Sequence, residues 1–151
     1  MHELVLTRIV DLPRELIWRA WTEPEHLVKW FTPAPWQTVH CEIDLKPGGK
    51  FRTIMRGPDG QEFDNSGCWL EVVKPERLVW TDALLPGYWP APNPFMTAIL
   101  TLEQQGAGTR YTARALHKDA AGRQKHEDMG FHSGWGKALD QLVEHMRTVK
   151  A

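Results

Sequence analysis

The stretch that decides the fold lies near the carboxyl end, where residues 126–146 read HEDMGFHSGWGKALDQLVEHM. From its middle onward, apolar residues recur three or four positions apart, at 135, 138, 139, 142, 143, 146 and 149. This spacing places them on one face of an α-helix for about four turns. The sequence therefore predicts that the chain ends in a long helix whose apolar face packs against another part of the molecule.

Three glycines interrupt the first half of this helical pattern, at 130, 134 and 136. A glycine inside a helix costs roughly 1 kcal/mol relative to alanine. We therefore expect either a bend in the helix or a neighbouring backbone that approaches it closely.

Length and composition indicate an ordinary globular chain. Its 151 residues predict one domain spanning 1–151, and 42% hydrophobic with 25% charged residues allow a normal core. A net charge of -1 argues against a nucleic-acid partner. No apolar run approaches the roughly 20 residues of a bilayer span, and the first residues lack the basic start of a signal peptide. We therefore expect no membrane insertion and a cytoplasmic location.

Tryptophan is unusually abundant. Eight occur in this short chain, at 18, 21, 30, 36, 69, 80, 89 and 135. Such large flat side chains either surround a void and form a wall for ligands, or simply fill a thin core between sheet and helix. The sequence leaves both readings open.

The first third of the chain predicts a strand followed by two short helices. Residues 3–10 are rich in Val, Leu and Ile, as in a strand, and 14–21 have helical spacing. Thr22 and Glu25 have the spacing of a capping box, so a second helix is expected to begin there. Prolines that follow should end it near Phe31.

The middle of the chain predicts a strand meander. Apolar and polar residues alternate, and Gly- or Pro-containing turns separate the alternating segments. Between two of them, residues 84–95 are too rich in proline for a strand or helix and too aromatic for an idle loop. Strands are expected over 39–45, 51–56, 66–73, 77–83, 96–103 and 109–116.

This order of elements predicts an α+β fold. Strands adjacent in sequence tend to pair, and only the terminal helix is long enough to cover the apolar face of the resulting sheet. We expect a curved antiparallel sheet of six to seven strands wrapped around that helix. A twisted sheet cannot be filled completely at its open end, so a cavity is expected there, beneath the two short helices and residues 84–95.

Four motifs strengthen this prediction through a family resemblance that covers essentially the whole chain. With the element order, they resemble the START, birch-pollen-allergen and polyketide-cyclase (SRPBCC) superfamily, and within it the bacterial homologues of the activator of the heat-shock-protein-90 ATPase. The resemblance implies a helix-grip fold. The motifs are residues 13–30 (PRELIWRAWTEPEHLVKW), 44–51 (DLKPGGKF), 67–80 (GCWLEVVKPERLVW) and 129–135 (MGFHSGW).

The resemblance implies less about function than about fold. Members of the superfamily carry lipids, bind hormones, cyclise polyketides or aid a chaperone, and a fold does not choose among such roles. The motifs therefore predict the fold more sharply than the activity.

The expected cavity should be lined mainly by apolar side chains, with two aromatic residues, Trp89 and Phe95, as a lid. A mostly apolar pocket with few polar groups suits a small hydrophobic or aromatic ligand. The alternative is that the same side chains collapse into a solid core. The expected lining is Phe51, Thr53, Met55, Trp69, Trp80, Trp89, Phe95, Met96, Ala98, Leu100, Asp128, Phe131, His132 and Trp135.

Asp128 and His132 form the best catalytic candidate. On an unbroken helix they lie one turn apart on the side of Trp135, facing the sheet. A carboxylate that orients an imidazole there would make a general base. The alternative is that both bond to backbone at a loosened turn. His126 points to the far side of a straight helix and is expected in solvent, although a bend could bring it to the pocket rim.

Metal and thiol chemistry find no support in the sequence. His126 and His132 are six residues apart, which is not a shared-face spacing, and there is no HExxH arrangement. Cys41 and Cys68 are both expected to be buried. We therefore expect neither a metal nor a cofactor.

Three functions remain in consideration. The leading hypothesis is a module that binds a small hydrophobic molecule without a chemical step. A cyclase or hydrolase using Asp128 and His132 is the second, and a chaperone partner is the third, on family analogy alone. The last needs an exposed apolar patch, for example at Trp36 or Trp89, which could equally be a homodimer interface.

Overall fold

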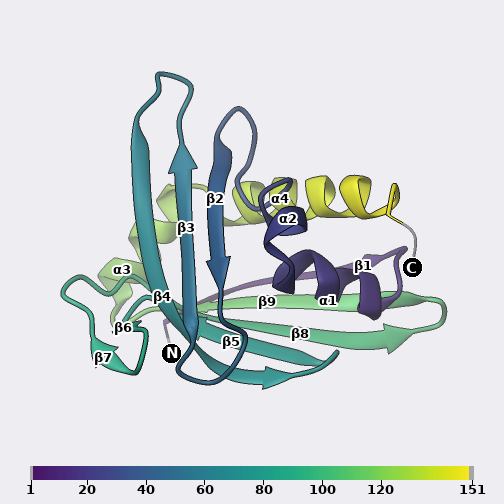
Figure 1. Cartoon of the computed structure of the whole chain (residues 1–151), viewed down its shortest axis with the longest axis horizontal. Coiled ribbons are helices and arrows are strands. Elements are labelled where there is room, and N and C mark those ends of the chain that lie inside the picture. Colours follow the sequence, from purple (N-terminus) through teal and green to yellow (C-terminus); the bar gives the residue numbers. More distant parts are fainter. Residues whose placement is uncertain (1, 150–151) are drawn as a thin grey trace.

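The structure, a computed structural model, describes residues 2–149 and is built on a seven-stranded antiparallel sheet (Figure 1). The spatial order is β1-β9-β8-β5-β4-β3-β2, so that neighbours in sequence pair except where β1 joins β9. The predicted α+β class and strand number are confirmed. The strands of this sheet are β1 (Glu3–Val10), β2 (Gln37–Ile43), β3 (Lys50–Arg56), β4 (Glu62–Val73), β5 (Arg77–Thr81), β8 (Thr97–Gln105) and β9 (Gly108–Leu116).

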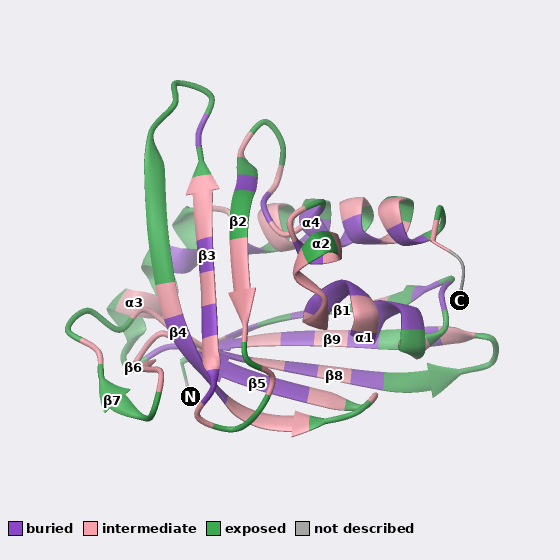
Figure 2. Ribbon diagram, viewed as in Figure 1, coloured by how far each residue is buried: buried purple, intermediate pink, exposed green. Residues whose placement is uncertain are grey.

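Helix α4 (Phe131–Met146) lies across the concave side of the sheet, as the apolar spacing predicts (Figure 1). Its inward positions are buried, while Trp135, Val143 and Val149 are partly buried and pack on the same core. Figure 2 shows that the buried residues gather where the sheet faces this helix, whereas the first half of β4 is exposed. The buried residues of α4 are Phe131, Gly136, Ala138, Leu139, Leu142 and Met146.

The expected break in the terminal helix is confirmed, and it lies at Gly130. Helix α3 (Ala120–Asp128) ends there, and Gly130 adopts a left-handed φ of 87° before α4 begins. A residue with a side chain rarely adopts that conformation, which explains this glycine. Gly136 has a different reason, because a Cβ atom there would lie 2.5 Å from the guanidinium of Arg8. The close neighbour is therefore a side chain and not a backbone.

The two short helices exist, but their junction differs from the prediction. Helix α1 (Arg14–Thr22) includes Thr22, whose hydroxyl donates to the carbonyl of Trp18 and caps nothing. Helix α2 (Pro24–Leu27) begins after Glu23, whose backbone is extended, and ends earlier than the expected Phe31. The predicted capping box is wrong because the hydroxyl finds a carbonyl in its own helix.

Residues 84–95 contain a small hairpin that the sequence does not predict. It joins β6 (Leu84–Leu85) to β7 (Trp89–Pro90), and its turn packs on the β2–β3 turn through a hydrogen bond from Gly87 N to Gly48 O. Trp89 is 71% exposed on it. The expectation that Trp89 forms a lid is therefore wrong, because the hairpin is held against the β2–β3 turn.

Within the described range, 2–149, none of the helices has the length and apolar character that crossing a membrane requires.

Candidate ligand-binding site

The strand register decides which side chains face α4. Phe51, Thr53 and Met55 of β3 share a face, and Met55 pairs with Phe63 on β4. Trp80 of β5 pairs both with Trp69 on β4 and with Ala98 on β8. Because side chains alternate along a strand, Met96 and Leu100 share the face of Ala98. This inner face therefore carries the following expected pocket residues: Phe51, Thr53, Met55, Trp69, Trp80, Met96, Ala98 and Leu100.

The centre of the inner face is occupied by aromatic rings. Phe51 stacks on Trp69 with ring centroids 4.5 Å apart and meets Trp80 edge-on at 5.0 Å. Phe31, from the segment after α2, adds a ring 5.7 Å from Phe51. Together with Thr53, Ala98 and Leu100, the three sheet aromatics are at least nine-tenths buried. This part of the inner face is packed core, the alternative that the sequence left open.

Two indole N–H groups in this core have no acceptor among residues 2–149. They belong to Trp69 and Trp80, whose Nε1 atoms are both buried. Trp21 and Trp30 differ, because their N–H groups donate to the Tyr111 hydroxyl at 3.2 Å and to the Ala20 carbonyl at 3.0 Å. A buried donor without an acceptor costs about 1 to 3 kcal/mol. The inner face therefore holds two unused donors.

Around the packed centre, the inner face is only half-buried. Met55 of β3, Phe95 and Met96 just before β8, and Trp135 of α4 are all of intermediate burial. Phe63, which shares a face with Met55, is 52% exposed. Apolar side chains at this edge are therefore within reach of a small molecule.

His126 lies buried at this edge, and not in solvent as expected for a straight helix. Only 6% of its surface is exposed. Its ring centroid lies 4.8 Å from that of Phe95, 5.1 Å from Phe131 and 5.8 Å from Trp135. The prediction fails because the bend at Gly130 changes the direction of α3 and brings this side chain inward, the alternative that the sequence analysis allowed.

A second histidine supports the first. Nε2 of His117, at the end of β9, lies 2.9 Å from Nδ1 of His126. Burial, followed by the charge that His117 would carry, lowers the pKa of His126 to about 4. The imidazole of His126 is therefore neutral at neutral pH. The sequence does not indicate His117 as a site residue, because nothing in its local pattern shows which distant side chain it contacts.

Asp128 and His132 do not form the expected pair. Both are exposed; the Asp128 carboxylate accepts from Gln124 at 2.9 Å, and Nε2 of His132 lies 3.2 Å from the carbonyl oxygen of Val5. The expectation that they face the sheet together is wrong, because Gly130 interrupts the helix between them. No carboxylate-imidazole base is assembled from these two residues.

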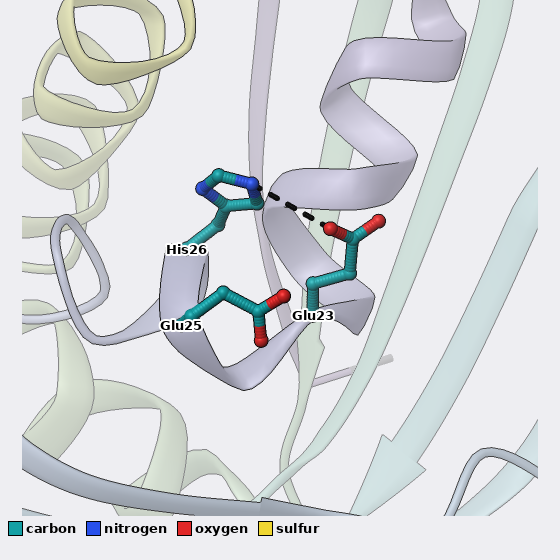
Figure 3. Close-up of side chains that lie close together, drawn as sticks. All are labelled: Glu23, Glu25 and His26. Carbon is teal, nitrogen blue, oxygen red and sulfur yellow. Dashed lines mark ion pairs between the residues drawn. The ribbon is translucent and has the colours of Figure 1, made fainter. Parts of the chain in front are cut away.

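One cluster of potential metal ligands lies elsewhere, at the junction of α1 and α2 (Figure 3). Glu23, Glu25 and His26 offer ligand atoms within 4.8 Å of one another. The carboxylate of Glu23 lies 3.5 Å from Nε2 of His26 and is also paired with Arg19 at 3.0 Å. Nδ1 of His26 lies 3.0 Å from Nε2 of His145 on α4. These contacts describe an ion-paired helix junction in which a guanidinium already neutralises one carboxylate.

The cysteines are poorly suited to nucleophilic chemistry. Burial raises the pKa of Cys41 to about 12. Cys68 is fully buried, and its thiol lies 3.4 Å from the carbonyl oxygen of Trp69. A thiolate is the reactive form of cysteine, so the environment of Cys41 disfavours reaction at neutral pH. Burial keeps reagents away from the thiol of Cys68.

A surface depression of mixed polar and apolar lining occurs elsewhere on the molecule. It has a volume of about 690 Å³ and lies between the β2–β3 turn and the tip of the β6–β7 hairpin. Glu42, Lys50 and Tyr88 are among its lining residues. It contains none of the residues that the sequence analysis expected in a pocket.

A curved antiparallel sheet with a long helix on its concave side defines the helix-grip class of START-like proteins. A family model described as Activator of Hsp90 ATPase homolog 1-like protein matches residues 11–147. The chain therefore belongs to that family, as its motifs predict.

Solved structures agree with this assignment. A crystal structure of a protein from Nitrosomonas europaea is 49% identical, with a TM-score of 0.94 over 97% of this chain and 94% of that one. A protein from Mycobacterium smegmatis is 25% identical, with a TM-score of 0.82 over 98% and 92% of the two chains. An NMR structure of an AHSA1-like protein from Aeromonas hydrophila, 19% identical, has a TM-score of 0.74 over 97% and 92%. A comparison with curated protein sequences found no match.

Proposed function

We propose that the protein binds a small hydrophobic or aromatic molecule at the half-buried edge of the inner face, between the sheet and α4. The observation that carries this proposal is the pair of buried indole N–H groups on Trp69 and Trp80 that have no acceptor within residues 2–149. Protein interiors rarely leave such donors unused, so each calls for an acceptor from outside the chain, either a bound molecule or an ordered water.

The strand register supports one location for that molecule. Ala98 is paired with Trp80, and Met96 lies two residues before Ala98 on the same face, about 7 Å along the strand. The ring of Phe95, the residue before Met96, lies 4.8 Å from the ring of His126, measured between centroids. A single ligand that covers Met96 would therefore lie between the unused donor of Trp80 and the ring cluster around His126.

Ligand binding is tested first with the wild-type protein and a panel of small aromatic and fatty molecules. Tryptophan fluorescence and amide chemical shifts report binding. We expect saturable shifts at residues 95–98 and 131–135. Shifts confined to the surface depression beside Tyr88, or no saturable shifts, would contradict the proposal.

The unused donors make a sharper prediction when Trp80→Phe is compared with Trp30→Phe. Both changes remove similar volume, but only Trp30 loses a hydrogen bond that the free protein makes. We expect Trp30→Phe to lower the free energy of unfolding of the ligand-free protein by about 1 to 3 kcal/mol more than Trp80→Phe does. Urea unfolding measures this difference.

The same two variants should rank in the opposite order for ligand binding. Trp80→Phe should weaken the best ligand of the panel by several-fold, whereas Trp30→Phe should leave its affinity unchanged. Equal unfolding free energies, together with an unchanged affinity for Trp80→Phe, would show that the indole N–H has no external acceptor.

A chaperone contact is a separate proposal that rests on the family description. The β6–β7 hairpin, on which Trp89 and Tyr88 are exposed, is the surface to test. Light scattering should come first, because an exposed aromatic surface also suits a homodimer. If the protein is monomeric and Trp89→Ser leaves capture by the bacterial chaperone unchanged at moderate salt, this surface is not the contact.

We also propose that the protein is located in the cytoplasm. Its two free cysteines agree with that reducing compartment.

A further inference from the structure

The hydrogen bonds of the two buried histidines determine where their protons lie. Nδ1 of His117 is 3.0 Å from the carbonyl oxygen of His2, which can only accept, so this nitrogen carries a proton. In the neutral ring, Nε2 of His117 is then an acceptor. It lies 2.9 Å from Nδ1 of His126, which must be the donor of that bond. Nδ1–H of His126 therefore donates to Nε2 of His117, and Nδ1–H of His117 donates to the carbonyl of His2.

This order leaves Nε2 of His126 with a lone pair and no proton. Within residues 2–149, the structure gives this atom no hydrogen-bond partner, although the side chain is more than nine-tenths buried. The other ring neighbours of His126 are Phe95, Phe131 and Trp135, which offer aromatic carbon surface and, from one indole, a single N–H. The ring is buried but Nε2 itself keeps some contact with solvent, so an acceptor of fixed orientation is accessible at the edge of this cluster of aromatic rings.

We propose that Nε2 of His126 accepts a hydrogen bond from the hydroxyl group of an aromatic or aliphatic ligand, so that the site selects neutral hydroxyl compounds such as phenols. This inference rests on the proposed function and names its ligand class. His117 acts as a positioning residue, because it holds the tautomer of His126 and does not touch the ligand.

The chemistry of the site favours a hydroxyl over other polar groups. A carboxylate has no proton to donate, and a neutral imidazole offers it no charge. A hydroxyl donates one hydrogen bond and still accepts others. It can therefore donate to Nε2 of His126 and still accept a hydrogen bond from another group, while the rest of the ligand covers the apolar surface of Phe95 and Met96.

A matched pair of ligands tests the inference on the wild-type protein. 4-Ethylphenol and 4-ethylanisole have the same ring and alkyl group, but only the phenol has a hydroxyl proton. We expect the phenol to bind about tenfold more tightly or better, as measured by calorimetry and tryptophan fluorescence. 4-Ethylbenzoate as its carboxylate should bind more weakly than the phenol.

Substitutions test whether the imidazole of His126 causes the preference for the phenol over the anisole. His126→Phe keeps a ring but removes the acceptor, and it should bind phenol and anisole alike. His117→Phe should lose most of the preference because His126 is then free to adopt the other tautomer. The exposed His132→Ala is the control and should keep the full preference.

The tautomer can be measured without a ligand. Nitrogen-15 chemical shifts and ring couplings of the wild-type protein should show Nδ1 of His126 protonated and Nε2 unprotonated at pH 7. A protonated Nε2 would overturn the inference, even if His126→Phe failed to fold.

The outcomes separate the two proposals. If 4-ethylphenol and 4-ethylanisole bind equally at residues 95–98 and 131–135, the ligand site is supported and the proposed role of His126 is rejected. If neither these two compounds nor any other member of the panel binds there, both proposals are rejected. A preference for the phenol that survives in His126→Phe would also reject the imidazole as its cause.

Discussion

The indole nitrogens of four buried tryptophans fall into two groups. Those of Trp21 and Trp30 donate to acceptors provided by the fold, whereas those of Trp69 and Trp80 have none within the described chain. All four side chains are nearly fully buried, so burial alone does not distinguish them. The difference lies in which groups face each indole, and it is the reason that we propose the inner face as the place where an external acceptor binds.

His126 predicts how stability depends on pH. Its pKa is about 4 in the folded protein and 6.5 in the unfolded chain, so between these values the unfolded state binds more protons. The free energy of unfolding should therefore fall as the pH is lowered from 6.5 to 4, by roughly 2 to 3 kcal/mol from this residue. Urea unfolding at several pH values measures the loss.

The comparison that isolates this residue uses His126→Phe. That variant should lose correspondingly less stability over the same pH interval, while His132→Ala, at the exposed histidine, should follow the wild type. Parallel pH profiles for His126→Phe and wild type would mean that the imidazole is not held neutral by burial.

At the scale of elements, the junction of α3 and α4 decides which side chains reach the inner face. Gly130 is left-handed there, and Phe131 begins the helix that covers the sheet. An unbroken helix would place Asp128 and His132 inward and His126 outward. The observed bend produces the reverse arrangement, so one residue's backbone conformation determines which imidazole is buried.

Two glycines of this region should respond oppositely to alanine. Gly130→Ala forces a side chain into a φ of 87° and should lower the free energy of unfolding by about 1 to 2 kcal/mol. Gly134 lies inside α4, where an added Cβ would meet only Pro33 Cγ at 3.9 Å. Gly134→Ala should therefore leave stability unchanged or raise it by up to about 1 kcal/mol.

Thermal or urea unfolding of the two variants tests this pair. If Gly130→Ala proved as stable as Gly134→Ala, the left-handed bend would not be a requirement of the fold.

At the scale of the whole molecule, contacts far apart in sequence hold the short helices to the sheet. β1 pairs along its length with β9, from Glu3 and Leu116 to Val10 and Thr109. A buried hydrogen bond from Trp21 Nε1 to the Tyr111 hydroxyl then ties α1 to β9 across the core. These contacts connect the first strand and first helix of the chain to β9.

Tyr111→Phe tests the contribution of that hydrogen bond. The change leaves the indole N–H of Trp21 buried without an acceptor and should lower the free energy of unfolding by about 1 to 3 kcal/mol. Tyr88→Phe, at the exposed hairpin turn, should change it by less than about 0.5 kcal/mol. Similar small effects of the two substitutions would show that the Trp21–Tyr111 bond does not stabilise the molecule.

The sequence by itself determined the class of fold and most of its elements, but not the β6–β7 hairpin. Alternating apolar residues predict the strands of the large sheet, and three-and-four spacing predicts the terminal helix. The glycines at 130, 134 and 136 predict either a bend in that helix or a close neighbour. These signals are local, because side-chain periodicity follows from backbone geometry within a few residues. Boundaries depend on competing local bonds, so the sequence around Thr22 predicts a helix cap although its hydroxyl donates to the carbonyl of Trp18.

Only the tertiary structure decided which groups meet on the inner face. Phe31 enters the core beside Phe51, and His117 reaches His126, through contacts between elements whose relative positions no local pattern encodes. The direction of the bend at Gly130 likewise selects His126 over Asp128 and His132. The helix-grip architecture follows from repeated local patterns, whereas the candidate site depends on a few distances between remote residues that only the packed molecule sets.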